Sequence, residues 1–129
     1  MNGNKLLLDT NILIYLSKKE LSLEDFACES DILYLSVISY MEAKGYPFIN
    51  KQEETIIERL CENLFKVHLS ENIIEKVVGL RKQNKIKLPD AIILASAIEH
   101  NLKLITRNVK DFESAAPLNI LVNPFKEEG

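Results

Sequence analysis

The stretch KLLLDTNILIYLS, residues 5–17, decides the fold. Its apolar run, Lys5–Leu8, is typical of a buried strand, and residues 11–17 are expected to follow directly as a helix, with Asp9, Thr10 or Asn11 near its cap. A strand that passes at once into a helix is the first half of a strand–helix–strand unit. The same alternation continues along the chain, which predicts a parallel sheet with helices on both faces.

Further signals complete this sheet. Strands are expected at 31–35, 65–69, 102–106 and 119–122. Helices are expected at 22–29, at 39–43, from Asn50 onward, after Ser70 and after Pro89. We therefore predict an α/β fold with three layers, an α/β/α sandwich, around a five-stranded and mainly parallel sheet.

Length and composition fit one ordinary globular domain. The chain has 129 residues, of which 47% are hydrophobic and 27% charged, so we expect a single domain over 1–129. No apolar run approaches the roughly 18 residues of a membrane span, and residues 6–8 are too few for a signal-peptide core. We therefore expect a cytoplasmic protein with no membrane contact. Cys28 and Cys61 form no metal-binding motif and are expected to be small buried thiols.

Four acids lie near the ends of the predicted strands. Asp9 follows the first strand, Glu42 is expected in the first helical turn after the second, Asp90 opens the helix before the fourth, and Asp111 follows the fourth. In open α/β sheets, ligands bind beyond the carboxyl ends of the strands. Converging carboxylates repel one another, and a hard cation such as Mg²⁺ or Mn²⁺ relieves that repulsion. The pattern predicts metal-assisted hydrolysis of a phosphodiester.

Each acid also has a purely structural interpretation. Asp9 would cap the first helix, and Glu42 would complete an S-x-x-E capping box with Ser39. Asp90 would interact favourably with the dipole of its helix, and Asp111 would be a cap or a solvated charge. Only the occurrence of all four acids at one edge of the sheet favours a site.

Four segments carry a resemblance to a known family: LLLDTNILIY at 6–15, LSVISYME at 35–42, LPDAIILASA at 88–97 and LITRNVKDF at 104–112. In order and spacing they resemble the motifs of PIN domains over nearly the whole chain, and most nearly those of VapC-type toxins from toxin–antitoxin pairs. The resemblance implies a Mg²⁺- or Mn²⁺-dependent ribonuclease, commonly a homodimer inhibited by a cognate antitoxin protein.

The resemblance also assigns roles to residues of the site. Asp9, Glu42 and Asp90 match the three core acids of the family, which implies that they are catalytic and hold the metal. Thr106 matches a polar residue that supports the site, and Asn11 is a neighbour of the first acid.

The position of the fourth acid is ambiguous. Many PIN domains carry an acid where this chain has Asn108, and Asp111 comes three residues later. Asn108 offers a carbonyl oxygen but no charge, so a second metal would be bound more weakly than the first. Either Asn108 or Asp111 is expected to position the attacking water or a second ion.

Basic residues concentrate around the later motifs, with seven Lys and Arg against two acids in residues 81–110. Lys85, Lys87, Arg107 and Lys110 are candidates to hold RNA phosphates, and each of them is equally well explained as a solvated charge. Few aromatic residues and no Trp give no sign of a platform for stacking bases. The apolar cluster at 46–49 is expected to be buried under the following helix, whereas exposure would mark a protein contact.

Four other interpretations compete with this one. A haloacid-dehalogenase-like phosphatase would need an Asp where the chain has Asn11, and a receiver domain would need a phospho-accepting Asp after the third strand, where residues 68–71 offer none. A non-catalytic PIN-fold binding module, or an RNA-processing nuclease without an antitoxin, stays open.

Overall fold

The computed structural model describes residues 3–117 and 119–125. Its centre is one sheet of five strands in the order β3-β2-β1-β4-β5, and every neighbouring pair is parallel. The strands are β1 (Lys5–Leu8), β2 (Ile32–Ser36), β3 (Phe65–Val67), β4 (Lys103–Ile105) and β5 (Leu121–Val122). The predicted α/β fold with a five-stranded parallel sheet is confirmed.

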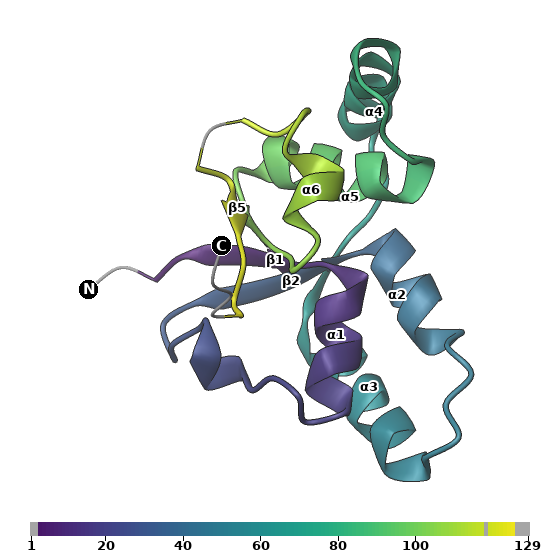
Figure 1. Cartoon of the computed structure of the whole chain (residues 1–129), viewed down its shortest axis with the longest axis vertical. Coiled ribbons are helices and arrows are strands. Elements are labelled where there is room, and N and C mark those ends of the chain that lie inside the picture. Colours follow the sequence, from purple (N-terminus) through teal and green to yellow (C-terminus); the bar gives the residue numbers. More distant parts are fainter. Residues whose placement is uncertain (1–2, 118, 126–129) are drawn as a thin grey trace.

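Helices cover the two faces of this sheet (Figure 1). They are α1 (Thr10–Ser17), η1 (Leu23–Asp25, a 3₁₀ turn), α2 (Val37–Lys44), α3 (Lys51–Asn63), α4 (Glu71–Gln83), α5 (Leu88–His100) and α6 (Val109–Phe112). One core lies between the sheet and α4, α5 and α6, and the other lies between the sheet and α1, α2 and α3. This arrangement is the predicted three-layer sandwich.

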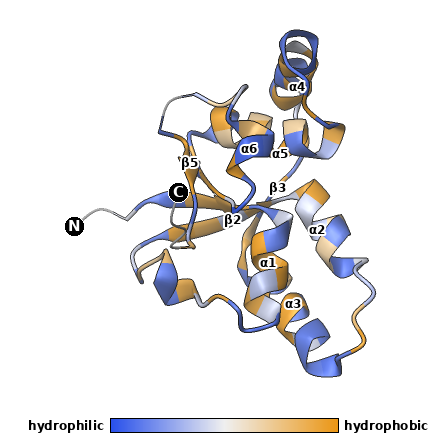
Figure 2. Cartoon of the chain, in the orientation of Figure 1, coloured by the Kyte–Doolittle hydropathy of each residue, from blue (hydrophilic) through white to orange (hydrophobic). Residues whose placement is uncertain are grey.

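Strand β1 shows why its sequence is apolar almost throughout. Leu7 packs into the core beneath α4 and α5, whereas Leu6 and Leu8 point to the other face and pack with α1 and α3. Successive side chains of a strand alternate between faces, so a strand covered on both sides must be apolar at every buried position. Figure 2 shows the strands as an orange centre, with most of the blue residues on the outer faces of helices and in loops.

The region after α1 differs from the prediction. A helix was expected at 22–29, but only the single 3₁₀ turn η1 forms, with Ser22 and Asp25 capping each other. Asp31 accepts hydrogen bonds of 2.9 Å from the backbone N–H of Cys28 and of 2.8 Å from that of Asn4. These bonds hold the segment as a loop that leads into β2. In consequence Cys28 is exposed, contrary to the prediction, while Cys61 is buried as expected.

Helix α2 begins earlier than the sequence suggested. Strand β2 ends at Ser36, whose hydroxyl accepts a hydrogen bond of 3.2 Å from the backbone N–H of Ile38 and so caps the helix. The S-x-x-E capping box at Ser39 is therefore not formed, and Glu42 lies in the second turn rather than the first. The carboxylate of Glu42 therefore takes no part in a helix cap.

The apolar cluster at 46–49 is mostly exposed, which contradicts the prediction that the following helix buries it. Tyr46, Pro47 and Ile49 are exposed, and only Phe48 packs against the core of α1 and α3. The segment is a connection between α2 and α3, and one side chain is enough to anchor it.

Among the described residues, no helix combines the length and the apolar character that crossing a bilayer requires.

Candidate active site

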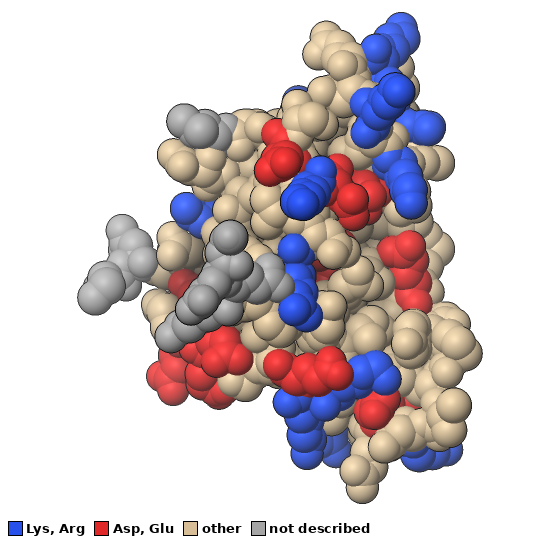
Figure 3. Space-filling view, in the orientation of Figure 1, with Lys and Arg blue, Asp and Glu red and all other residues tan. Residues whose placement is uncertain are grey.

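The topology brings the carboxyl ends of β1, β2 and β4 side by side, because β1 pairs with both of its neighbours in parallel. A cleft of about 570 Å³ opens at this end of the sheet. The residues that line it are Asp9, Thr10, Asn11, Ile14, Tyr15, Lys18, Glu20, Glu42, Tyr46, Asp90 and Asn108. Figure 3 shows acidic side chains on this face, in the region between α6 and α2.

Asp9 lies at the junction of β1 and α1 and is buried, with 5% of its surface exposed. Its Oδ1 accepts a hydrogen bond of 2.8 Å from the backbone N–H of Thr10, which caps the helix, and its Oδ2 accepts one of 2.8 Å from the hydroxyl of Thr106. Burial raises the pKa of Asp9 to about 6, the two hydrogen bonds oppose that rise, and the charges of Asp90 and Glu42 add to it. Asp9 is thus both a helix cap and the buried acid of the cleft.

Glu42 reaches the cleft from the second turn of α2. Its Oε1 accepts a hydrogen bond of 2.6 Å from the hydroxyl of Thr10, which also lies 2.9 Å from the hydroxyl of Ser39. Thr10 therefore links α1 to α2, and its backbone and side chain contact Asp9 and Glu42 respectively.

Asp90 enters from the first turn of α5. Leu88 and Pro89 are the first two residues of the helix, and Lys87 occupies the cap position with no side-chain bond. Burial raises the pKa of Asp90, the negative charges of Asp111 and Glu42 raise it further, and Lys87 lowers it. A carboxylate at this position also faces the positive end of the helix dipole.

The two candidates for the fourth position lie in different places. Asn108 lines the cleft, and its backbone N–H donates a 3.0 Å hydrogen bond to the hydroxyl of Thr106. Asp111 does not line it; it borders an adjoining hollow with Lys110, although its charge reaches Asp90. Asn108 therefore lines the cleft with the three acids, whereas Asp111 lies beside it, and among the neighbouring charges that raise the pKa of Asp90 that of Asp111 has the largest effect.

The predicted RNA contacts are scattered around the cleft. Lys87 is close enough to influence Asp90, and Lys110 lies in the adjoining hollow. Lys85 is exposed but does not line the cleft. The guanidinium of Arg107 lies 4.2 Å from the ring centre of Phe125 and 5.4 Å from that of Tyr15, so its side chain packs on aromatic rings. The predicted supporting residues, Thr106 and Asn11, contact Asp9 and line the cleft respectively.

Sequence reasoning missed the far wall of the cleft. This wall contains Ile14, Tyr15, Lys18 and Glu20, together with Tyr46 from the loop after α2. Positions 11, 14, 15 and 18 lie on one helical face, and this spacing could have predicted that they line the same wall. Nothing local could have placed Tyr46 beside it.

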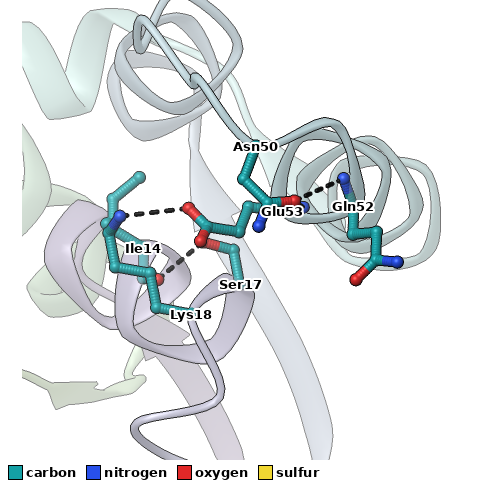
Figure 4. A network of polar contacts seen from close by, with 6 residues as sticks. All are labelled: Ile14, Ser17, Lys18, Asn50, Gln52 and Glu53. Carbon is teal, nitrogen blue, oxygen red and sulfur yellow. Dashed lines mark hydrogen bonds and ion pairs between the residues drawn. The ribbon is translucent and has the colours of Figure 1, made fainter.

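A salt bridge fixes this wall to the neighbouring helix. The Nζ of Lys18 lies 3.0 Å from Oε1 of Glu53 on α3, and Figure 4 shows this ion pair. Asn50, one helical turn before Glu53, caps the start of α3. The same cation is 5.9 Å from the ring centre of Tyr46. Helix α1, helix α3 and the loop after α2 are therefore held together at this end of the cleft.

The donor set of the cleft suits a hard divalent cation. Asp9, Glu42 and Asp90 offer only oxygen atoms, and negative charges beside a buried carboxyl raise its pKa, a repulsion that a cation would remove. In the ranges 3–117 and 119–125, no three or more His, Cys, Asp or Glu side chains lie together so that they could hold a metal ion as a group. An open set of carboxylates fits Mg²⁺, which usually keeps several waters and takes only one or two protein carboxylates.

Comparison with known proteins gives a consistent result. The family model described as the PIN domain matches residues 6–117. A toxin–antitoxin complex from Klebsiella pneumoniae contains a chain that is 37% identical, with a TM-score of 0.70 and coverage of 95% of this chain and 99% of that one. VapBC-1 from nontypeable Haemophilus influenzae is 32% identical, with a TM-score of 0.65 over 84% and 90% of the two chains. VapBC2 from Rickettsia felis, bound to a promoter DNA fragment, shares the fold at 23% identity, with a TM-score of 0.74 over 92% and 98%. A comparison with curated protein sequences gave no significant match.

Proposed function

The chain belongs to the PIN domain family, and from that premise we propose that it is a Mg²⁺- or Mn²⁺-dependent endoribonuclease, the toxin of a toxin–antitoxin pair. The observation that carries the proposal is the convergence of Asp9, Glu42 and Asp90 on one cleft, with Asp9 buried and its pKa raised to about 6. The negative charges of Asp90 and Glu42 raise the pKa of Asp9, and a divalent cation in the cleft would relieve this repulsion.

Each residue of the cleft has a defined task in this proposal. A divalent ion held by Asp9, Glu42 and Asp90, directly or through water, would lower the pKa of bound water and offset negative charge on a phosphodiester. Thr106 and the backbone of Thr10 fix the carboxylate of Asp9, which lines the cleft. The hydroxyl of Thr10 fixes the carboxylate of Glu42.

Asn108 is the candidate to orient the attacking water, because it lines the cleft next to the three acids. Its amide can donate and accept hydrogen bonds but carries no charge. Asp111 borders the adjoining hollow, and its charge raises the pKa of Asp90. With an uncharged Asn108 in the cleft, we propose that one ion is held, or that a metal is held only together with the substrate.

The polyanionic substrate must be held by cations outside the acids. Lys87 is close enough to Asp90 to lower its pKa, and Lys110 lines the next hollow along the surface. In Figure 3, Lys and Arg side chains gather over α4 and the turn that follows it, beside the acidic region. A backbone that crosses from this basic area into the cleft would bring one phosphate to the carboxylates.

We also propose a protein partner. The related structures are complexes of toxins with antitoxins. This chain exposes Met41 on α2 and Ile49 in the loop that follows α2, the loop from which Tyr46 enters the cleft, and exposed apolar side chains of this kind fit a protein contact. The homodimer and the cytoplasmic site of action belong to the same proposal.

The test is cleavage of RNA by the purified chain with Mg²⁺, with Mn²⁺ and with EDTA. We expect cutting that needs the metal and is lost in Asp90→Asn. The control is Glu75→Gln on α4, an exposed acid outside the cleft that receives the same chemical change. Cutting that survives EDTA or Asp90→Asn would contradict the proposal. No cutting of several RNAs, together with metal binding, would favour a non-catalytic binding module.

A further inference from the structure

The cleft extends well beyond the carboxylates, along one face of α1. Asn11, Ile14, Tyr15 and Lys18 all line it, and the helical rise separates the first from the last by about 10 Å. A stacked nucleic-acid strand advances about 3.4 Å per nucleotide, so this wall has the length of about three nucleotides. The extension is larger than a metal and one phosphate require.

Tyr46 presents an aromatic ring at the far end of this wall. The ring is 40% exposed and lies 4.6 Å from that of Phe48, the anchored residue of the loop. The Nζ of Lys18 is 5.9 Å from the same ring centre. The ring therefore contacts Phe48 and Lys18 while it lines the cleft.

Tyr15 is a second supported ring, one helical turn before Lys18. Phe125 meets it edge-on, with ring centres 4.9 Å apart and an angle of 69° between the planes. A nitrogen of Arg107 donates a hydrogen bond of 3.4 Å to its hydroxyl. These contacts hold the ring in one orientation as it lines the cleft.

The charges of this region favour a neutral group over a phosphate. Glu20 lines the same wall, and the cation of Lys18 is already paired with Glu53 at 3.0 Å. A phosphate placed here would meet acidic oxygens, whereas a base has no charge and an aromatic face. Bases of unpaired RNA stack on Tyr rings, and a cleft of this volume is in the range of small-ligand sites.

We propose that Tyr15 and Tyr46 form a stacking site for an unpaired RNA base that flanks the phosphate at the carboxylates. This inference rests on the proposed function, since it names the form of RNA that the same cleft accepts. Single-stranded or looped RNA would enter, because a base within a duplex cannot be stacked in this way. Tyr15 and Tyr46, which the sequence composition gave no reason to pair, would then select unpaired RNA over a duplex.

The test measures affinity for a fluorescein-labelled, 12-nucleotide single-stranded RNA of randomised sequence, by fluorescence anisotropy in an Asp90→Asn background that prevents cleavage. Tyr46→Leu and Tyr15→Leu are expected to weaken binding by roughly 5- to 100-fold each, which is the range of stacking on one base. Tyr46→Phe and Tyr15→Phe keep the rings and are expected to bind within about twofold. Phe65→Leu, which removes an exposed aromatic ring on β3 outside the cleft, is the matched control.

An abasic version of the same RNA tests stacking from the other side, because it removes the bases and leaves the tyrosines unchanged. Stacking predicts that it binds more weakly and that Tyr46→Leu no longer matters for it. Equal affinity of the Leu variants and their parent for the randomised RNA would overturn the inference and assign the exposed ring to a protein partner. A loss that is the same for abasic RNA would also overturn it.

The two proposals fail in different ways. A chain that stacks RNA in this assay but never cuts it, with the native Asp90 and either metal, contradicts the nuclease and leaves the base site standing. A chain that cuts RNA equally well with Leu at both positions contradicts the base site alone. A chain that binds no RNA contradicts both.

Discussion

The hydroxyl of Thr106 donates a 2.8 Å hydrogen bond to Oδ2 of Asp9, and the two residues are 97 positions apart in the sequence. They meet because β1 and β4 are parallel neighbours that end at the same level, with Leu8 opposite Ile105. The backbone N–H of Asp9 also donates to the carbonyl of Ile105 at 3.0 Å. The central acid of the site is thus positioned by the register of the sheet.

Thr106→Val should show what this hydroxyl contributes. The variant keeps the shape of the buried side chain but removes a donor to Asp9 and an acceptor from the backbone of Asn108. We expect the free energy of unfolding to fall by about 1–3 kcal/mol. The loss should be larger at pH 8 than at pH 5, because a hydrogen bond to an ionised carboxylate is the stronger one.

Urea unfolding at the two pH values measures this difference, and Thr106→Ser is the matched control. The Ser variant keeps the hydroxyl and loses a methyl group, so its cost should not change with pH. Equal costs for Thr106→Val at pH 5 and pH 8 would show that the hydroxyl does not serve the carboxylate.

Asp9→Asn should make the chain more stable at neutral pH. The folded chain holds a proton on Asp9 up to about pH 6, whereas an unfolded Asp releases it near pH 4. Between these values the folded state binds more protons, so this group makes stability fall as the pH rises. The difference corresponds to about 3 kcal/mol above pH 6.

The comparison is the free energy of unfolding from pH 4 to pH 8 for the parent and for Asp9→Asn. The two curves should separate between about pH 4 and pH 6, with the variant the more stable above that range. Parallel curves would mean that the pKa of Asp9 is not raised by the fold.

Arg107→Ala should destabilise the fold through lost packing. Its guanidinium lies over the ring of Phe125 and near that of Tyr15, so it ties the end of β4 to α1 and to the C-terminal segment. A cation–π contact at an exposed site contributes about 0.5–1 kcal/mol. Thermal unfolding should show a loss of that order, and Lys110→Ala, an exposed cation three residues later, should leave the midpoint unchanged.

Two glycines should respond in opposite directions to alanine. A Cβ on Gly79, inside α4, would meet no atom within 4 Å, so Gly79→Ala should stabilise the fold by about 0.5–1 kcal/mol through helix propensity. A Cβ on Gly3 would lie 1.7 Å from the carbonyl oxygen of Ser30, so Gly3→Ala must displace backbone and should destabilise it. Chemical denaturation measures the stability of both variants. The result for Gly3→Ala tests the close packing of the segment before β1.

The sheet and its acids were accessible from sequence because their signals are local. The apolar run from Leu6 to Leu8 predicts a strand buried on both faces, and Asp9 follows it directly. Parallel strands share an edge, so acids that follow different strands can be expected to meet there. The placement of Asp9, Glu42 and Asp90 in one cleft agrees with this expectation.

What the sequence could not give depends on distant contacts. The sequence suggested a helix cap at Ser39, but the helix is capped at Ser36, where β2 stops pairing with β3 opposite Val67. The loop at 26–31 exists because Asp31 bonds to Asn4, which lies 27 residues away. Tyr46 reaches the cleft only because the turn between α2 and α3 returns past α1, and no local pattern encodes this.

The most direct test of the central claim is calorimetric titration of Mn²⁺ into the chain and into Asp9→Asn, Glu42→Gln, Asp90→Asn and Asp111→Asn. The account predicts about one ion per chain for the parent. It predicts at least about tenfold weaker binding for each of the first three variants, since each removes a negative ligand oxygen from the cleft. Asp111→Asn should weaken binding less than these three variants do, because Asp111 lies outside the cleft and acts on it only through its charge. Unchanged affinity in Asp9→Asn, or a loss confined to Asp111→Asn, would contradict the assignment of the cation to these three carboxylates.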